Sequence, residues 1–350
     1  MGHVLCTFNA NNLFLRYKFA KTFFGDRSGK SRLSKAEAEV FGYLPANLPG
    51  SFEVFAPEMR DLAARALRRD GTKDDYPDIV CVQEVESLLA LRRFNQEHLS
   101  NAYPYALVID SHDLRQIDVG ILSKHELTDI RTHVDDHSSV GTKKDPWLFS
   151  RDCLEVDVVF NKSGTKRITL FINHLKSKMG DTDEERKKAA ERRELQAEAV
   201  RAIVRRRFPG AEFTKAHFAV VGDLNDEPGS DPVAPLVKNC GLVNALERIS
   251  QPEDRWTYWY KSKNRASQID YLLLSPALDK AAQKKPEIER RGIAFRSRLA
   301  NGQPGPKQTY YCRKDGDPNP IPVAFQFPRF AKVGPNLAAS DHCPVFLDVP

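Results

Sequence analysis

Short apolar runs, each bordered by turn-forming residues, recur along the whole 350-residue chain and constrain its fold more than any other feature. The runs are rich in Val, Ile, Leu and Phe, which is typical of β-strands. We expect strands at Val4–Phe8, Asp78–Val82, Asp118–Leu122, Leu154–Phe160, Ile168–Ile172, Phe218–Val221, Ile269–Leu274 and Pro344–Val349. Because helical patterns lie between some of these strands, the sequence predicts an α/β fold.

Two segments carry the signals of helices. The first opens at Pro57, and proline suits the first helical position; it has an apolar stripe and ends at Asp70-Gly71. The second begins near Thr182, where Glu185 can complete a capping box, and runs to about Arg207. Acidic residues at its start and arginines at its end suit the helix dipole. This placement favours a capped, solvated helix over the alternative, a nucleic-acid patch.

The composition fits one globular domain. Hydrophobic residues make up 41% and charged residues 29%, which excludes a disordered chain. No low-complexity linker or internal repeat divides the sequence, so we expect a single domain over residues 1–350 with long loop insertions near 19–55 and 302–335. The second insertion carries seven of the 22 prolines. Since long loops in compact domains are often functional, we expect both insertions to shape a substrate groove.

The net charge and the cysteines indicate the kind of partner and the cellular compartment of the protein. The 53 Lys and Arg against 47 Asp and Glu give a formal net charge of +6, which favours an anionic partner. No apolar run is long enough to span a bilayer, and the first residues lack the pattern of a secretory signal, although a removed leader is an alternative. Cys6, Cys81, Cys153 and Cys343 lie in apolar runs, as buried free thiols do. We therefore expect a cytoplasmic protein.

Polar residues cluster where four of the apolar runs stop, at Asn9–Asn12, Gln83–Glu86, Asn173–Ser177 and Gly222–Asp226. Active sites of α/β proteins gather at one set of strand ends, so this pattern predicts a single shared cleft. Each cluster alone has an alternative explanation, because Asn, Asp and Gly also form ordinary turns.

Most candidate side chains carry hard oxygen atoms. The set comprises Asn9, Glu84, Asp223, Asn225, Asp270 and Asp341, together with His174 and His342. Carboxylates and amides suit Mg²⁺, Mn²⁺ or Ca²⁺ rather than zinc. A divalent ion, a carboxylate that activates water and cationic groups that hold negative charge are what phosphate-ester hydrolysis requires.

Seven segments in order closely resemble motifs of the endonuclease/exonuclease/phosphatase superfamily: FNANNLF, PDIVCVQEVE, FSRDCLEV, NHLKSK, VVGDLNDEP, SQIDYLLLS and SDHCPV. The superfamily includes pancreatic-type deoxyribonucleases, exonuclease-III-type repair enzymes, sphingomyelinases and inositol polyphosphate 5-phosphatases. The chain is most similar to its bacterial nuclease members. The resemblance implies a four-layer α/β sandwich, in which helices flank two packed mixed sheets and the site lies at the sheet edges.

The resemblance also implies a metal site and a catalytic carboxylate. Glu84 would be the principal ligand of Mg²⁺, for which Mn²⁺ can substitute, and Asp341 would be the second acidic residue. Asn9 would lie beside the metal and Asp223. Asp223 itself would orient or activate the attacking water.

The remaining matched residues would act on the phosphate. The resemblance implies that Asn225 and Arg151 bind phosphate, and that His174 serves as a general acid. His342 would contact the phosphate, with Asp270 as the carboxylate partner that fixes its tautomer.

Four of these assignments leave an alternative open. Asp341 and His342 are adjacent, so a regular strand would point them to opposite faces and the assignment requires irregular backbone. Asp270 could instead cap its strand or pair with a nearby basic residue. Arg151 could belong to a structural ion pair, and His174 could be an ordinary core histidine.

Catalytic residues shared by a superfamily do not select the substrate, but other features favour nucleic acid. The net charge is positive, NHLKSK precedes a charged helix, and the aromatic run Trp256–Tyr260 precedes Lys261, Lys263 and Arg265. Aromatic and cationic side chains together can stack bases and bind phosphates, although core packing is the alternative for the aromatics. Glu86 is a departure, because pancreatic-type enzymes place a DNA-contacting arginine at that position. The Cys-Asp-Arg pattern of inositol phosphatases is absent.

We therefore expect a Mg²⁺-dependent phosphodiesterase that hydrolyses DNA as an endonuclease. The alternative substrates are a phospholipid, an inositol phosphate or a nucleotide. A binding protein that kept the fold and lost catalysis is a third possibility, against which the complete polar set argues.

Overall fold

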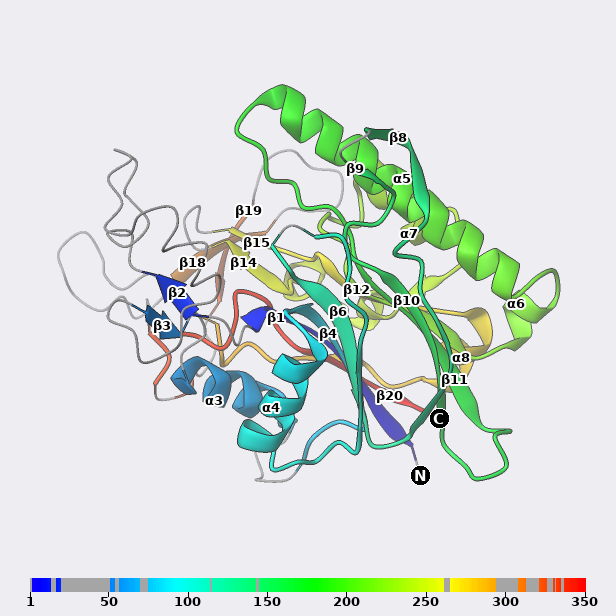
Figure 1. The fold of residues 1–350 in the computed structure, drawn as a ribbon, viewed down its shortest axis with the longest axis horizontal. Helices are drawn as coiled ribbons and strands as arrows, with labels where there is room; N and C mark the ends of the chain where they lie inside the picture. Colours follow the sequence, from blue (N-terminus) through cyan, green and yellow to red (C-terminus); the bar gives the residue numbers. More distant parts are fainter. Residues whose placement is uncertain are drawn as a thin grey trace, which may run out of the picture.

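A computed structural model describes residues 2–13, 17–19, 51–53, 57–69, 75–113, 115–142, 145–260, 265–293, 308–312, 321–325, 330, 332–334 and 337–350. Its centre is a pair of six-stranded sheets that face one another (Figure 1). The order of the first sheet is β17 (Glu287–Ile288), β20 (Val345–Val349), β1 (His3–Leu13), β4 (Ile79–Val85), β6 (Asp118–Ser123) and β5 (Tyr105–Val108). The order of the second is β13 (Val243–Asn244), β16 (Asp270–Leu274), β12 (Phe218–Asp223), β11 (Arg167–His174), β10 (Cys153–Val159) and β7 (Glu126–Arg131).

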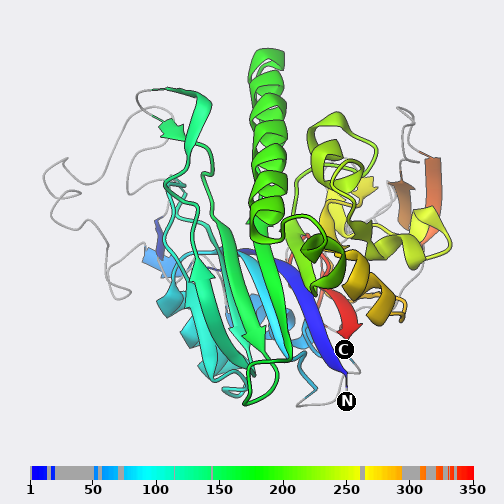
Figure 2. The ribbon, with the colours of Figure 1, turned by 90° about the vertical axis from the view of Figure 1, so that its right-hand side faces the viewer.

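Both sheets are mixed, and each has one parallel pair at its centre. β1 runs parallel to β4, and β11 runs parallel to β12, while the other strand pairs of these two sheets are antiparallel. The antiparallel pairing of β1 with β20 places His3 opposite Val349. The two ends of the chain therefore lie side by side at one end of the molecule (Figure 2).

The core between the sheets follows from the two-residue period of the strands. Leu5 and Cys81 of the first sheet pack against Ile172, Val221 and Leu272 of the second, and all five are fully buried. The outer faces of both sheets also carry buried apolar side chains, so they require helices to cover them.

Helices cover both outer faces, so the fold has four layers (Figures 1 and 2). α3 (Pro57–Ala66) and α4 (Leu88–His98) pack on the first sheet, with Leu62 and Leu91 in one core with Phe8. The long helix α5 (Asp183–Arg207) packs Val200 and Val204 on the second sheet. The expected four-layer α/β sandwich is therefore confirmed.

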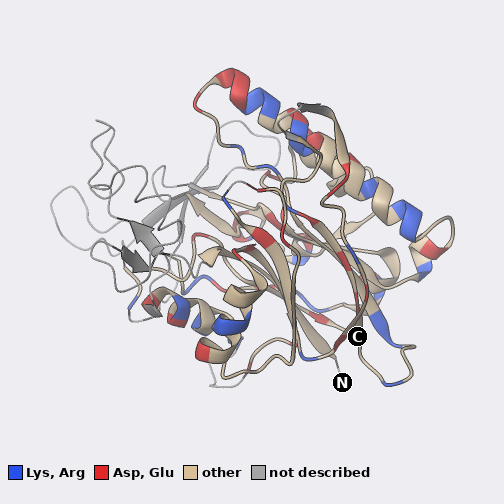
Figure 3. Cartoon of the chain, in the orientation of Figure 1, with Lys and Arg blue, Asp and Glu red and all other residues tan. Residues whose placement is uncertain are grey.

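The expected capping of α5 is present. The Thr182 hydroxyl accepts from the Glu185 N–H at 3.2 Å, and the Glu185 carboxylate accepts from the Thr182 N–H at 3.2 Å. Figure 3 shows acidic residues at the start of the helix and basic ones toward its end. Two of the terminal arginines make local contacts, because Arg205 lies 3.6 Å from the Phe213 ring centroid and Arg207 lies 3.0 Å from Glu155. This end of α5 is built as a capped helix terminus.

All eight expected strands are present, although β1 and β4 extend five and three residues beyond their expected ends at Phe8 and Val82. Further short elements join them. Smaller sheets comprise β14 (Tyr258–Tyr260), β15 (Arg265–Ser267), β18 (Gln308–Cys312) and β19 (Ile321–Phe325); β2 (Tyr17–Phe19) and β3 (Ser51–Glu53); and β8 (His137–Thr142) and β9 (Asp145–Trp147). The short helices are α6 (Glu212–Lys215), α7 (Ala234–Val237), α8 (Pro276–Ala281), and the 3₁₀ turns Asp231–Val233, Ala245–Arg248 and Pro252–Asp254. The described parts of the two expected insertions thus contain short strands, and the rest of both insertions lies outside the described residues.

The cysteines behave as expected. Cys6, Cys81, Cys153, Cys240 and Cys343 are free and buried. Among the described helices, none has the length and apolar character needed to cross a membrane.

Gly222, the residue before Asp223 on β12, is required by a close backbone approach. Its φ is +124°, and a Cβ at this position would lie 2.0 Å from the carbonyl oxygen of Asn173 on β11.

We expect Gly222→Ala to lower the free energy of unfolding by about 3 kcal/mol or more, measured by chemical denaturation. Gly164→Ala is the control, because Gly164 has φ +69° with no atom near the added Cβ and should cost only about 1 kcal/mol. Equal effects of the two substitutions would contradict this explanation.

Candidate active site

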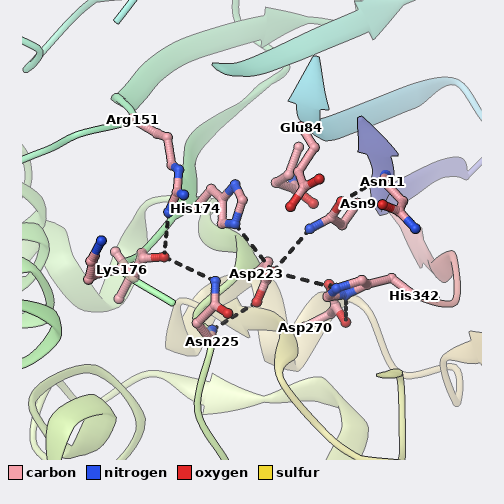
Figure 4. Close-up of polar contacts among 12 residues, drawn as sticks. Asn9, Asn11, Glu84, Arg151, His174, Lys176, Asp223, Asn225, Asp270 and His342 are labelled. Carbon is pink, nitrogen blue, oxygen red and sulfur yellow. Dashed lines mark hydrogen bonds and ion pairs between the residues drawn. The ribbon is translucent and has the colours of Figure 1, made fainter. Parts of the chain in front are cut away.

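The strand ends of both sheets meet at one edge of the sandwich. Asn9 is paired with Gln83 in the first sheet, and His174 and Asp270 are both paired with Asp223 in the second. The Asn9 amide donates to Asp223 Oδ2 at 3.1 Å and so joins the two sheets (Figure 4). Residues far apart in the chain are therefore brought together at one site, as the polar clusters predict.

The backbone at this edge is irregular. Glu84 has φ +62°, and it occupies the break in register between Gln83 and Val85 where β4 pairs with β6. Such a bulge turns a side chain out of the normal alternation of a strand. Asn11 and Asn225 also have positive φ, at +49° and +57°. Unfavourable backbone conformations of non-glycine residues concentrate at functional sites, and these three residues belong to the polar clusters predicted to share one site.

Asp223 lies at the centre of the cluster (Figure 4). Its Oδ1 accepts from the Asn225 backbone N–H at 2.8 Å, and its Oδ2 lies 3.5 Å from His174 Nε2 and 3.8 Å from His342 Nε2. Burial, with a further contribution from Asp270, raises the pKa of Asp223 to about 7, although His342 opposes the shift. A carboxylate with a pKa near neutrality is well matched to accept a proton at physiological pH.

His342 lies between two carboxylates. Its Nδ1 is 2.9 Å from Asp270 Oδ2, and the Thr257 hydroxyl donates to that same oxygen at 2.6 Å. Burial would lower the pKa of His342, but the negative charges of Asp270 and Asp223 outweigh burial and raise the pKa to about 10. His342 is therefore an imidazolium at neutral pH, and its Nε2 side faces Asp223.

The segment that carries Asp341 and His342 is not a regular strand. Ser340 and His342 form isolated bridges with Ile293 and Tyr258, and the Asp341 carbonyl accepts from the Trp259 N–H at 2.8 Å. The irregular backbone that the adjacent pair requires is therefore present.

Two carboxylates of the cleft carry poorly compensated negative charge. Burial raises the pKa of Glu84, and the neighbouring Asp341 raises it further; burial likewise raises the pKa of Asp341. Only 14% of the Glu84 side chain is exposed, and Arg115 Nη2 lies 3.7 Å from its Oε2. A half-buried pair of hard oxygen donors with raised pKa values is the environment that a divalent cation would stabilise.

A second acidic group is less suited to a metal. Asp223, Asp270 and His342 offer ligand atoms within 4.8 Å of one another. However, a protonated imidazole has no free lone pair for a metal, and His342 is held in that form by the two carboxylates. The residues thus divide into a metal-compatible pair, Glu84 and Asp341, and a hydrogen-bonded group around His342.

Asn9 lies between these two groups. Its Oδ1 accepts from the Asn11 N–H at 3.0 Å, while its NH₂ group points to Asp223. Asn9 therefore orients the Asp223 carboxylate, and Asn11, through its backbone, orients Asn9.

His174 is buried and neutral. Burial lowers its pKa well below the usual range, with a smaller effect from Arg151, and its Nδ1 has no hydrogen-bond partner in the described part of the chain. It is placed in the cleft beside Asp223 rather than in the apolar core. A neutral imidazole would gain a proton only when a negative group, such as a phosphate, binds nearby.

Arg151 forms the structural ion pair that the sequence leaves open as an alternative. Its Nε lies 3.0 Å from Asp113 Oδ2, and its Nη1 donates to the Leu175 carbonyl at 3.1 Å. The Asn225 amide donates to the same carbonyl at 3.0 Å. A structural ion pair thus holds Arg151 at the margin of the cleft (Figure 4).

Sequence reasoning missed Arg115 and Thr257, and it singled out Tyr258 only as part of the aromatic run. Arg115 donates to Asn12 Oδ1 at 2.7 Å, and the Tyr258 ring centroid lies 4.7 Å from that of His342. Arg115 precedes β6, which is antiparallel to β4, so the start of β6 meets the end of β4. The antiparallel pairing of these two strands could therefore have identified Arg115 as a site residue from the sequence. No local signal marks Thr257.

The aromatic side chains of the run Trp256–Tyr260 lie in two different environments. Trp256 and Trp259 are each only 1% exposed and share a small core with Ile293 and Cys343. The expectation that they offer faces to bases is wrong for these two tryptophans, because both side chains are buried in this core. Tyr258 and Tyr260 lie on the other side with ring centroids 6.2 Å apart, while Lys261 and Lys263 lie outside the described residues.

Comparison with known proteins places this architecture in a family. A sequence profile described as the Endonuclease/Exonuclease/phosphatase family matches residues 54–319, more than half of the chain. The chain belongs to this family, whose enzymes are metal-dependent phosphoesterases. Asn9, Asp341 and His342 lie outside the matched range, and the fold brings them to Glu84 and Asp223 within it.

Two similar solved structures share the fold. SmcL is 12% identical with a TM-score of 0.50, over 100% of this chain and 99% of that one. The human Nocturnin catalytic domain is 13% identical with a TM-score of 0.51, over 100% and 94% of the respective chains. At such low identity the likeness concerns the fold alone. The search of curated protein sequences found no match.

Proposed function

We propose that this protein is a Mg²⁺-dependent phosphodiesterase that hydrolyses DNA as an endonuclease. The observation that carries the proposal is the position of Asp223, which is bonded to Asn9 and lies 3.8 Å from the His342 imidazole at the junction of the two sheets. Membership of a phosphoesterase family supports the class of reaction. The choice of DNA rests on the positive net charge and on Tyr258 beside His342.

Asp223 is the residue suited to accept a proton from the attacking water. Asn9 and the Asn225 N–H hold its two oxygens, so the carboxylate has one orientation. With a pKa of about 7, it is substantially ionised at neutral pH and basic enough to take the proton.

Three side chains would bind the phosphate. The imidazolium of His342 and the guanidinium of Arg151 would offset the negative charge that grows in the transition state. His174, protonated once the phosphate binds, would give a proton to the leaving oxygen.

Glu84 and Asp341 would hold Mg²⁺, or Mn²⁺ in its place, with Asn9 nearby. When bound, the ion supplies charge neutralisation of the phosphate and the leaving oxygen. Because Arg115 and the ion compete for the same Glu84 carboxylate, Arg115 would keep Glu84 oriented before the ion arrives.

The proposal is tested by incubating the purified protein with supercoiled plasmid and Mg²⁺, with and without EDTA. We expect nicked and linear DNA that EDTA abolishes. Release of phosphate or headgroup from phospholipids, inositol phosphates or nucleotides, without cutting of DNA, would instead establish the alternative substrate class. No hydrolysis of any of these would support a binding protein.

We expect Glu84→Gln to raise the Mg²⁺ concentration for half-maximal activity at least about tenfold, because the amide loses the negative charge that attracts the ion. The measurement is a Mg²⁺ titration of the nicking rate. Glu86→Gln is the matched control two residues further, and it should leave the titration unchanged. Identical titrations of Glu84→Gln and the unmodified protein would remove Glu84 from the metal site.

A further inference from the structure

Three metal-binding side chains meet at the edge of the first sheet opposite to the cleft. His3 begins β1, Asp78 immediately precedes β4, and His125 follows the end of β6. Since β1 and β4 are parallel and β6 is antiparallel to β4, the two strand starts and this strand end lie at the same edge. Asn9 and Glu84 lie at the other ends of β1 and β4, so the group is separate from the candidate active site. It is close to the chain ends seen in Figure 2.

The backbone holds these residues in place. The Asp78 N–H donates to the Val4 carbonyl at 2.9 Å, and the Lys124 N–H donates to the Asp78 carbonyl at 2.9 Å. The Val4 N–H also donates to Asp78 Oδ2 at 2.7 Å. One carboxylate oxygen is thereby fixed, while the other, Oδ1, lies 3.8 Å from His125 Nε2.

The spacing of the donor atoms suits a bound ion. One ligand atom from each of the three residues lies within 4.8 Å of the others. The ligand atoms of one transition-metal ion, at bond lengths of about 2.0–2.2 Å, lie somewhat closer to one another than these three donor atoms do. Small rotations of the side chains would bring the donor atoms to that spacing. His125 Nε2 is buried and has no hydrogen-bond partner among the residues described. A buried nitrogen without a partner is costly, and an ion would satisfy it.

The surroundings keep both imidazoles in the form that binds metals. Burial lowers the pKa of His3 and of His125 and outweighs the opposite effect of the Asp78 charge, so both rings are neutral at physiological pH. The Phe160 ring stacks on His3 with centroids 4.0 Å apart and limits its rotation. Lys124 Nζ lies 3.9 Å from Asp78 Oδ1 but donates to the Tyr76 carbonyl at 2.6 Å. Its charge weakens the attraction for a cation, so we expect moderate affinity.

We propose that His3, Asp78 and His125 form a second metal site, which binds a Zn²⁺-like ion through two imidazoles and one carboxylate, with water completing the coordination. Nitrogen donors select Zn²⁺ and similar ions over Mg²⁺, whereas the oxygen donors of Glu84 and Asp341 select Mg²⁺. The three residues are only half-buried, which leaves room for the water ligand. An ion here would join three strands of the first sheet and stabilise the folded chain.

The test compares Zn²⁺ binding by the full chain with that of variants, by isothermal titration calorimetry. All proteins carry Glu84→Gln, so that Zn²⁺ at the active site does not obscure the result. We expect this protein to bind one more Zn²⁺ than its His125→Ala variant. His217→Ala is the matched control, because His217 is a half-buried histidine outside the group, and it should bind Zn²⁺ like the parent. His3→Ala, at the start of the chain, repeats the test with little risk to folding.

Two further readouts separate metal binding from packing. Zn²⁺ should raise the melting temperature by about 2 °C or more in the parent and in His217→Ala, but not in His125→Ala or His3→Ala. With Glu84 intact, His125→Ala should leave Mg²⁺-dependent hydrolysis unchanged. Equal Zn²⁺ stoichiometry and equal thermal shifts in all variants would overturn the proposal and leave these histidines as packing residues around Phe160.

Discussion

Asp223→Asn is expected to lower kcat at least about 1000-fold, because it removes the group that accepts the proton from water. The amide has the shape of the carboxylate and can keep one of its contacts with Asn9 or the Asn225 N–H. The circular dichroism spectrum and the melting temperature should therefore stay close to those of the unmodified protein. The measurement is the nicking rate of plasmid DNA at saturating Mg²⁺.

The control for this prediction is Asp231→Asn, which changes an exposed carboxylate in the same stretch of chain. It should keep the full rate. A folded Asp223→Asn protein with near-normal turnover would show that another group activates the water, and the proposed chemistry would have to be abandoned.

His342→Gln is expected to lower kcat/KM by about 100- to 1000-fold, since the imidazolium that faces the phosphate is lost. The unmodified protein should show a bell-shaped profile of kcat/KM against pH. The rate rises through pH 7 as Asp223 loses its proton, because the pKa of Asp223 is raised to about 7. It falls through pH 10 as His342 loses its proton, because the pKa of His342 is raised to about 10.

The two limbs of this profile test the assignment separately. In His342→Gln the residual activity should lose the alkaline limb and keep an acidic limb moved to higher pH, because His342 no longer lowers the pKa of Asp223. Asp270→Asn should move the alkaline limb to lower pH, because the Asp270 charge raises the pKa of His342. If the alkaline limb stays in place in both variants, His342 is not the group that titrates there.

The layered fold was predictable because buried strands and amphipathic helices carry strong local patterns. The strands of the sheet centres, such as Phe218–Asp223, have every residue buried and read as continuous apolar runs. The edge strand Glu126–Arg131 was missed because most of its residues face solvent, so it has no apolar pattern. Helix α4 was missed although Ser87 caps it, with its hydroxyl accepting from the Ala90 N–H, as Ser commonly does at a helix start.

The residue types of the active site were also readable from the chain, because each lies in a short motif at a strand end. Their arrangement in space could not be predicted from the sequence. Asn9 and Asp223 are 214 positions apart, and their contact depends on how the two sheets pack. The same holds for the pKa values of Asp223 and His342, which arise from burial and from neighbours in other strands. Local sequence specifies strands, helices and caps, because these depend on contacts within a few residues. The shifted pKa values and the pairing of distant side chains arise only when the two sheets pack together.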